Sequence, residues 1–214
     1  MNNGRNNSIS RRIKRLADIF VAAVALIICA PVMAVAAFMI LVTLGPPVIF
    51  RQQRAGLHGR PFIMPKFRTM TDTRDAQGRL LPDSQRMTRL GAFLRKTSID
   101  ELPQFWNVLK GDMSVIGPRP LPVEYLDLYT VEQYRRHEVP AGMMGWASVR
   151  GRNTNSWEKK FELDLWYVDN WSLLLDIKIF FMGIITALSG AGVNEEGAAT
   201  SSSFTGSGIS DKTD

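Results

Sequence analysis

The sequence predicts an α+β, mostly helical protein, in which a proline-broken, re-entrant membrane helix precedes a compact cytoplasmic domain with a small β-hairpin and interfacial helices. Two observations predict this fold. Residues 19–44 contain no charged side chain and have Pro31 near their middle. Residues 48–70 form two short alternating segments around two glycines, as a β-hairpin does, and most of the later chain shows helical spacing or helix-boundary residues.

The charge is unevenly distributed along the 214 residues, whose formal net charge is +6. Residues 1–70 hold ten Lys or Arg and one acid, a charge of +9, whereas residues 71–214 sum to −3. A basic first third indicates an anionic partner. Nucleic acid would satisfy that charge, but it would not explain the apolar run between the basic residues, so anionic membrane lipid is favoured. The single cysteine, Cys29, cannot form an internal disulfide.

The apolar run is long enough to span the roughly 30 Å hydrocarbon core of a bilayer as a straight helix. Pro31 would remove one helix hydrogen bond and bend the run. Both flanks are basic, and positive charge marks the cytoplasmic side of a membrane. These features favour a helix that enters and returns, although a straight span with a central proline stays open.

Residues 48–50 read as a short strand that leads into a basic loop over 51–54, and residues 62–70 read as its partner strand. Lys66 and Arg68 would share one face of that second strand, where they could hold phosphate or simply face solvent. Residues 71–85 are polar and read as a loop.

The central stretch runs from Thr97 to Asn107 and contains the adjacent carboxylates Asp100 and Glu101. Ser98 and Glu101 have the spacing of a capping box, which predicts a helix start there and a helix that runs to about Lys110 and stops at Gly111. The two acids could be no more than favourable helix-start charges. They could also be a nucleophile, Asp100, and its acid/base neighbour, Glu101.

Several cations lie near this stretch in the sequence. Arg95 precedes it at the end of a predicted helix over 87–96, and Arg119 follows it between two prolines that would hold it rigidly. Arg150 and Arg152 flank a glycine in a candidate anion-binding loop. Further helices are predicted over 123–136, 157–171 and 173–188, the last one interfacial or core, and the tail from Gly190 is predicted to be poorly ordered.

Taken together, these residues resemble the bacterial sugar transferases, specifically the small monotopic phosphoglycosyl transferases. The matching stretches occur in the family's order over nearly the whole chain: Lys66–Met70, Asp100–Gln104, Gly111–Ser114, Gly117–Pro120, Gly145–Trp146, Gly151–Asn153 and Phe161–Asp169. The resemblance implies a basic arm and membrane hairpin over 1–46, a catalytic domain over 47–189 and a Gly/Ser/Thr-rich tail over 190–214. It implies a location at the cytoplasmic face of the bacterial inner membrane.

The resemblance also implies the chemistry. A phospho-sugar would move from a UDP-sugar to a polyprenol phosphate, with release of UMP, through a covalent intermediate on Asp100, with Glu101 assisting and Mg²⁺ offsetting the diphosphate charge at Asp100. The expected substrate-binding residues are Lys66, Arg68, Arg95, Arg119, Arg152 and Asp169. The tail, with Gly192–Gly197 and Phe204, resembles that of members acting on acetamido sugars. A non-catalytic, membrane-anchored partner of glycan-assembly enzymes is the competing hypothesis, and it would not need the carboxylate pair.

Overall fold

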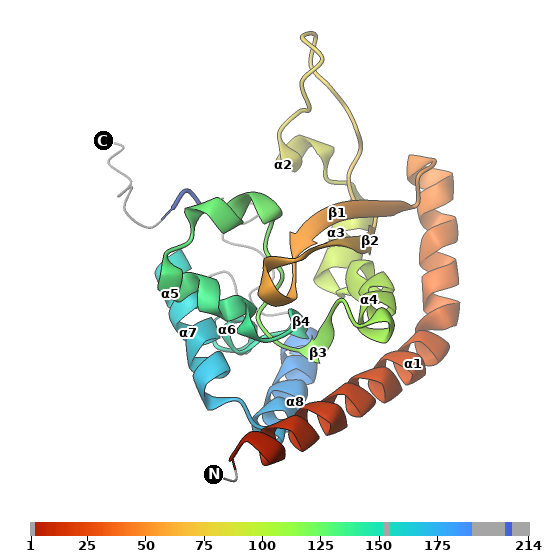
Figure 1. The fold of residues 1–214 in the computed structure, drawn as a ribbon. Helices are drawn as coiled ribbons and strands as arrows, with labels where there is room; N and C mark the ends of the chain where they lie inside the picture. The colour runs from red at the N-terminus through yellow and green to blue at the C-terminus, as the bar shows by residue number, and fades with distance from the viewer. Residues whose placement is uncertain (1–2, 152–154, 190–203, 207–214) are drawn as a thin grey trace.

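The computed structural model describes residues 3–151, 155–189 and 204–206 of the chain. They form a mostly helical body, as predicted, with two small sheets, and a long N-terminal helix lies along two of its sides (Figure 1). The N-terminal helix, α1, runs from Asn3 to Leu44 without interruption. It bends in its middle in Figure 1 and contains Pro31, whose ring cannot fit a regular helical turn. The predicted break is therefore a bend within one helix. Most of the predicted tail lies outside the described residues.

Two small sheets form the β part of the body. Strands β1 (Ile49–Ala55) and β2 (Pro61–Phe67) pair antiparallel around the 3₁₀ turn η1 (Leu57–Gly59), which confirms the predicted hairpin. Residues 51–54 belong to β1, so the prediction of a basic loop there was wrong: pairing with β2 extends the strand beyond the apolar residues. Strands β3 (Ser114–Ile116) and β4 (Gly142–Met144) pair in parallel.

Short helices connect these strands and longer ones close the body. The elements between β2 and β3 are α2 (Asp83–Arg86), α3 (Arg89–Lys96), the 3₁₀ helix η2 (Ile99–Gln104) and α4 (Phe105–Lys110). Those after β3 are η3 (Val123–Leu128), α5 (Val131–Tyr134), η4 (Arg135–Glu138), α6 (Trp146–Val149), α7 (Trp157–Asn170) and α8 (Leu173–Ser189). Gly111 ends α4 at φ 97°, which confirms the predicted stop.

The single helix predicted over 123–136 is three short pieces, so that prediction was wrong. Tyr129 and Thr130 are extended, and Thr130 then starts α5 in a capping box with Gln133. The Thr130 hydroxyl accepts the backbone N–H of Gln133, whose side chain accepts the N–H of Thr130. This local signal ends η3 and starts the separate helix α5.

Both halves of α1 pack against the body. Ala22 belongs to a core with Val115 and Ile179, and Ile40 belongs to a second core with Phe67 and Leu94. The opposite face of α1 leaves many large apolar side chains exposed, among them Phe20, Ile27, Ile28, Val35, Phe38 and Val42. Helix α8 also exposes apolar side chains, including Leu174, Phe181 and Ile185. Apolar surface of this extent marks an interaction with a membrane or a partner.

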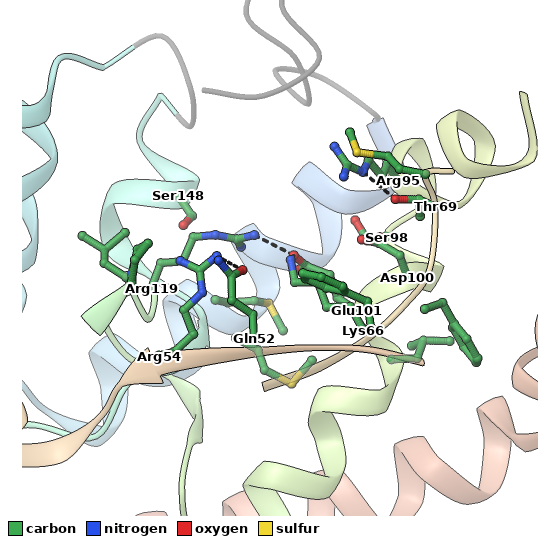
Figure 2. A pocket seen from close by; sticks show the side chains of 18 of the residues that line it. Gln52, Arg54, Lys66, Thr69, Arg95, Ser98, Asp100, Glu101, Arg119 and Ser148 are labelled. Atoms are coloured by element: carbon green, nitrogen blue, oxygen red, sulfur yellow. Dashed lines mark hydrogen bonds and ion pairs between the residues drawn. The ribbon is translucent and has the colours of Figure 1, made fainter. Parts of the chain in front are cut away.

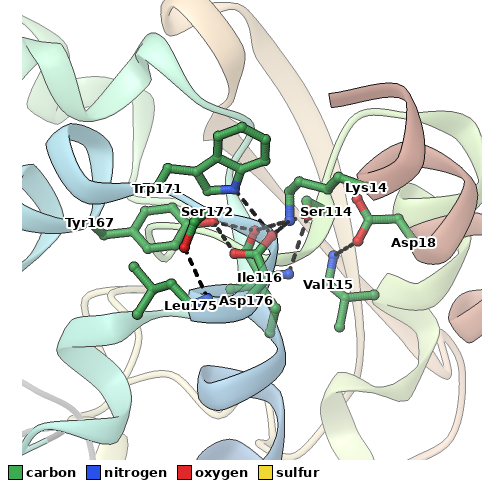
Figure 3. Close-up of polar contacts among 10 residues, drawn as sticks. All are labelled: Lys14, Asp18, Ser114, Val115, Ile116, Tyr167, Trp171, Ser172, Leu175 and Asp176. Carbon is green, nitrogen blue, oxygen red and sulfur yellow. Dashed lines mark hydrogen bonds and ion pairs between the residues drawn. The ribbon is translucent and has the colours of Figure 1, made fainter. Parts of the chain in front are cut away.

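A buried polar network joins α1, β3 and α8 (Figure 3). The Lys14 ammonium binds the Asp176 carboxylate at 2.7 Å and donates to the Ile116 carbonyl at 3.0 Å. Tyr167 and Trp171 donate to the same carboxylate at 2.7 and 3.2 Å. The network fixes the start of α1 to the strand that leads toward Arg119.

Replacing Asp176 with alanine should therefore lower the free energy of unfolding by about 3–5 kcal/mol, because Lys14, Tyr167 and Trp171 would lose one shared acceptor inside the protein. Thermal unfolding of the detergent-solubilised protein measures this change. Asp169, whose ion pair with Arg135 is exposed, provides the control, and its alanine variant should leave the thermal midpoint nearly unchanged. Equal losses in the two variants would contradict the prediction.

Candidate active site

A cleft of about 1000 Å³ opens between the β-hairpin, the α3–η2 segment and the helices that follow β4 (Figure 2). Six of the eight residues expected to form the site line it: Lys66, Arg68, Arg95, Asp100, Glu101 and Arg119. Asp169 is not among its lining residues and pairs with Arg135 on an exposed face. Arg152 lies outside the described residues.

The two carboxylates are carried by η2, whose start differs from the predicted capping box. Ser98 has left-handed backbone angles, with φ 57°, and its side chain caps nothing. The Glu101 carboxylate does not reach back to the helix start, because it binds two cations instead. The capping box was therefore a wrong prediction, and tertiary charge pairing is the reason.

Glu101 is held between strand β2 and the segment after β3. Its Oε1 lies 2.7 Å from Lys66 Nζ and 2.6 Å from an Arg119 guanidinium nitrogen. Burial alone would raise the pKa of Glu101, but Arg119 and Lys66 outweigh burial and hold the pKa well below its usual range. Glu101 is therefore ionised and poorly suited to accept a proton.

Asp100 is in the opposite situation, although it is the next residue. It is only 6% exposed, and within the described part of the chain its carboxylate makes no ion pair. Burial and the neighbouring Glu101 charge raise the pKa of Asp100 to about 6, against the lowering effect of Lys66, Arg95 and Arg119. The result is a desolvated carboxylate in a cationic cleft, which suits a nucleophile aimed at phosphorus.

Arg119 is positioned by a second, deeper ion pair. Its carbonyl accepts a hydrogen bond of 2.8 Å from Arg136, whose guanidinium binds Asp164 at 2.6 Å. Arg136 and Asp164 are both buried, so this pair holds its geometry firmly. The predicted rigidity of Arg119 thus has a second source beside the two flanking prolines.

Arg95 and Arg68 line the part of the cleft near α3. The Arg95 Nε donates to the Thr69 hydroxyl at 3.1 Å. Helix α3 can approach Thr69 this closely because of Gly91, where a Cβ would lie 1.9 Å from the Thr69 carbonyl oxygen. Arg68 binds Asp72 at 2.7 Å and donates to the Pro46 carbonyl at 3.1 Å, and so also fixes the end of α1.

Comparison with known proteins now adds to this geometry. The family model described as "Bacterial sugar transferase" matches residues 9–190. The chain belongs to the bacterial sugar transferase family. It is 53% identical over 197 residues to "Uncharacterized sugar transferase EpsL" of Bacillus subtilis, covering 92% of this chain and 97% of that protein.

Other relatives of this sugar transferase carry more specific names. It is 42% identical over 188 residues to the "UDP-glucose:undecaprenyl-phosphate glucose-1-phosphate transferase" of Klebsiella pneumoniae, covering 83% of this chain and 40% of that protein. It is 40% identical over 188 residues to the "UDP-N-acetylgalactosamine-undecaprenyl-phosphate N-acetylgalactosaminephosphotransferase" of Aeromonas hydrophila, covering 84% of this chain and 44% of that protein. The chain thus spans less than half the length of these two relatives.

Gln52 and Arg54 are among the cleft residues of this sugar transferase that were not predicted from the sequence. Both line the cleft beside Phe50. Phe50 lies opposite Lys66 of β2, so these side chains share one face of the hairpin. The two-residue period of a strand, extended from Phe50 through the basic segment, would have identified both. The interpretation of 51–54 as a loop concealed this pattern.

The side chains of the described residues also limit the kind of metal site that the cleft could form. Among residues 3–151, 155–189 and 204–206, no group of three or more His, Cys, Asp or Glu side chains is arranged to hold a metal ion. With Glu101 engaged by two cations, Asp100 is the adjacent carboxylate that forms no ion pair with any residue that the structure describes. A cation that takes one protein carboxylate and completes its shell with water and phosphate oxygens would fit such a site, as Mg²⁺ commonly does.

The raised pKa of Asp100 predicts how the reaction depends on pH. If the ionised carboxylate attacks, the rate of the first step should rise with pH and level off above about pH 6, the pKa of Asp100. One pH unit below that value, the rate should be about a tenth of the plateau. Nucleotide release from a UDP-sugar in the absence of acceptor, followed between pH 4.5 and 8, measures this profile. A flat profile would contradict an Asp100 that titrates in this range.

Proposed function

We propose that this chain transfers a phospho-sugar from a UDP-sugar to polyprenol phosphate through a covalent phospho-sugar intermediate on Asp100. The observation that carries the proposal is the difference between the two carboxylates. Glu101 is neutralised by Lys66 and Arg119, whereas Asp100 is buried, lines the cleft and has no ion-pair partner among the described residues. The names of the relatives support the substrate classes, since they include transferases acting on UDP-sugars and undecaprenyl phosphate.

In the first step, an Asp100 oxygen attacks the phosphorus that carries the sugar. The bond from that phosphorus to the bridging oxygen breaks, and UMP leaves with the electron pair. In the second step, an oxygen of the polyprenol phosphate attacks the same phosphorus, which frees the Asp100 carboxylate and gives a polyprenyl diphosphate sugar. Phosphoryl transfer of this kind requires positioning and charge stabilisation more than proton transfer.

The other residues of the cleft supply the positioning. Lys66 and Arg119, held by Glu101, would bind the phosphate oxygens near Asp100, and Arg95 and Arg68 would add positive charge at the α3 side. In this assignment Glu101 orders the two cations and is not the base. Mg²⁺, bound through Asp100 and the substrate diphosphate, would offset charge on the departing nucleotide.

We propose that the sugar of the UDP-sugar donor is an acetamido sugar. The support is the resemblance of the tail, together with the relative whose name gives an N-acetylgalactosamine substrate. A panel of UDP-sugars with and without acetamido groups, assayed at equal concentration, tests this part separately. Preference for UDP-glucose over every acetamido sugar would overturn it.

The covalent intermediate can be tested directly. The purified protein, Mg²⁺ and a UDP-sugar labelled in the sugar are incubated without acceptor, and the intact protein and its peptides are weighed by mass spectrometry. We expect UMP release and a phospho-sugar adduct on the peptide that contains Asp100, discharged when undecaprenyl phosphate is added. A correctly folded protein that forms product with no adduct would overturn the covalent route, and one that forms neither would favour the non-catalytic partner.

We also propose that α1 re-enters the membrane and returns to the cytoplasmic face of the inner membrane. The described helices include one that is apolar and long enough to cross a membrane, over Ser8–Leu44. Support for the return comes from packing: Lys14 near the start of α1 and Ile40 near its end both contact the same body. A helix crossing to the other side would carry one of these residues away from that body.

Single cysteines placed at positions 7 and 57, in a Cys29→Ala background, should therefore react with a membrane-impermeant thiol reagent from the same side of inverted vesicles. The reason is that both ends of α1 would face the cytoplasm. Labelling of the two positions from opposite sides would contradict the re-entrant arrangement. Labelling after detergent treatment is the control that both cysteines are reactive.

A further inference from the structure

Arg54 is a partly buried cation of the cleft that has no role in the chemistry described above. Its backbone is held by a bridge to Pro122 and by the hydrogen bond from Ala55 N–H to the Leu121 carbonyl, at 3.0 Å. Those contacts join β1 to the segment that carries Arg119. The Arg54 and Arg119 side chains therefore reach the same cleft from two paired segments (Figure 2).

The guanidinium of Arg54 has only neutral partners in the described part of the chain. One nitrogen donates to the Gln52 amide oxygen at 2.6 Å, and another lies 3.4 Å from the Pro120 carbonyl oxygen. The Nε atom is buried and has no hydrogen-bond partner among the residues that the structure describes. Burial and the neighbouring Arg119 charge lower the pKa of Arg54 to about 10, which leaves it charged at neutral pH.

Five other cations that line the cleft differ from Arg54, because each has a carboxylate partner. Lys66 and Arg119 share Glu101, and three further arginines have a carboxylate of their own: Arg68 with Asp72, Arg86 with Asp83, and Arg136 with Asp164. Even partial burial makes a charge without a counter-charge costly. Such a cation, lining a cleft that is proposed to bind phosphates, indicates an anionic ligand.

We propose that Gln52 and Arg54 form a second phosphate subsite, which holds the nucleotide phosphate in the first step and the acceptor phosphate in the second. This inference rests on the proposed function. In-line displacement places the leaving oxygen opposite the Asp100 oxygen. The acceptor must later attack opposite Asp100 as well, so its phosphate occupies the place that UMP has left. In Figure 2, Arg54 lies across the Lys66–Glu101–Arg119 group from Asp100.

The substitution Gln52→Glu tests the subsite without removing a cation. A glutamate in place of Gln52 would give Arg54 a carboxylate at hydrogen-bonding distance. This carboxylate would neutralise the Arg54 guanidinium and make it less available to phosphate. The thermal midpoint should stay the same or rise. We expect KM to rise about tenfold or more for both the UDP-sugar and the polyprenol phosphate.

Gln53→Glu is the matched control, since it adds the same charge one residue along β1 at an exposed position that does not line the cleft. Its KM values should stay within about twofold of the unaltered protein, because exposed charges are screened. Arg54→Gln should raise the same KM values, and Arg54→Lys should restore them in part.

The two substrates are measured separately, with nucleotide release for the first step and discharge of the adduct for the second. A rise in KM for only one of the two substrates would overturn the use of the subsite by both phosphates and assign the subsite to the phosphate of that substrate. Unchanged KM values in Gln52→Glu would overturn the subsite altogether and leave Arg54 a structural residue. The proposed function fails by a different result, the absence of an Asp100 adduct in the unaltered protein at saturating UDP-sugar.

Discussion

Replacing Asp100 with asparagine is expected to lower turnover by at least about 10³-fold, because the amide cannot attack phosphorus and the reaction loses its covalent route. The phospho-sugar adduct should disappear, and UMP release without acceptor should fall to background. Asparagine has nearly the same shape, so the cleft should keep its form. The measurement combines steady-state product formation with the mass of the intact protein after incubation with UDP-sugar.

The fold of this variant should be at least as stable as that of the unaltered protein. Asp100 is buried next to the ionised Glu101 and makes no ion pair within the described residues, so a neutral side chain removes a repulsion. An unchanged or slightly higher thermal midpoint would separate lost chemistry from lost structure. Asp127→Asn, at an exposed position of η3, is the control and should keep full activity. Full turnover in Asp100→Asn would contradict the mechanism.

The elements that local signals define were predictable from the sequence. The structure has the predicted elements close to their predicted positions: the β-hairpin, α3, α7, α8 and the end of α4 at Gly111. Their sequence signals are local, since alternation, helical spacing and a glycine in the left-handed conformation each involve residues only a few positions apart. The cations and acids around Asp100 were also identified individually. Six of the eight expected site residues line one cleft.

What the sequence concealed depends on contacts between distant residues. Glu101 had a plausible local partner in Ser98, but its carboxylate binds Lys66, 35 positions earlier, and Arg119, 18 positions later. Two charge-assisted contacts outweigh one cap. Arg54 was not predicted for a related reason. Its orientation toward the cleft follows from the strand period, and only the pairing with β2 shows that β1 extends as far as Arg54.

Glu101→Gln is expected to be the second most damaging substitution, because Lys66 and Arg119 would lose the carboxylate that they share. We expect turnover to fall by about 10²-fold as the two cations lose their fixed positions. The free energy of unfolding should fall by about 2–3 kcal/mol, less than for a fully buried pair, since half of the Arg119 side chain is exposed. The pKa of Glu101 is lowered on folding, so this stabilisation is present above its ordinary pKa and is lost as the pH falls.

The pH profile of Glu101→Gln distinguishes this electrostatic role from a general loss of structure. The Glu101 charge raises the pKa of Asp100, whereas Lys66, Arg95 and Arg119 lower it. Removing only the raising charge should move the pKa of Asp100 below about 6, so the variant should retain more of its own plateau rate at pH 5 than the unaltered protein does. Nucleotide release without acceptor, measured across the same pH range, tests this shift. A break that stays at the same pH or moves upward would show that Glu101 does not set the ionisation of the nucleophile.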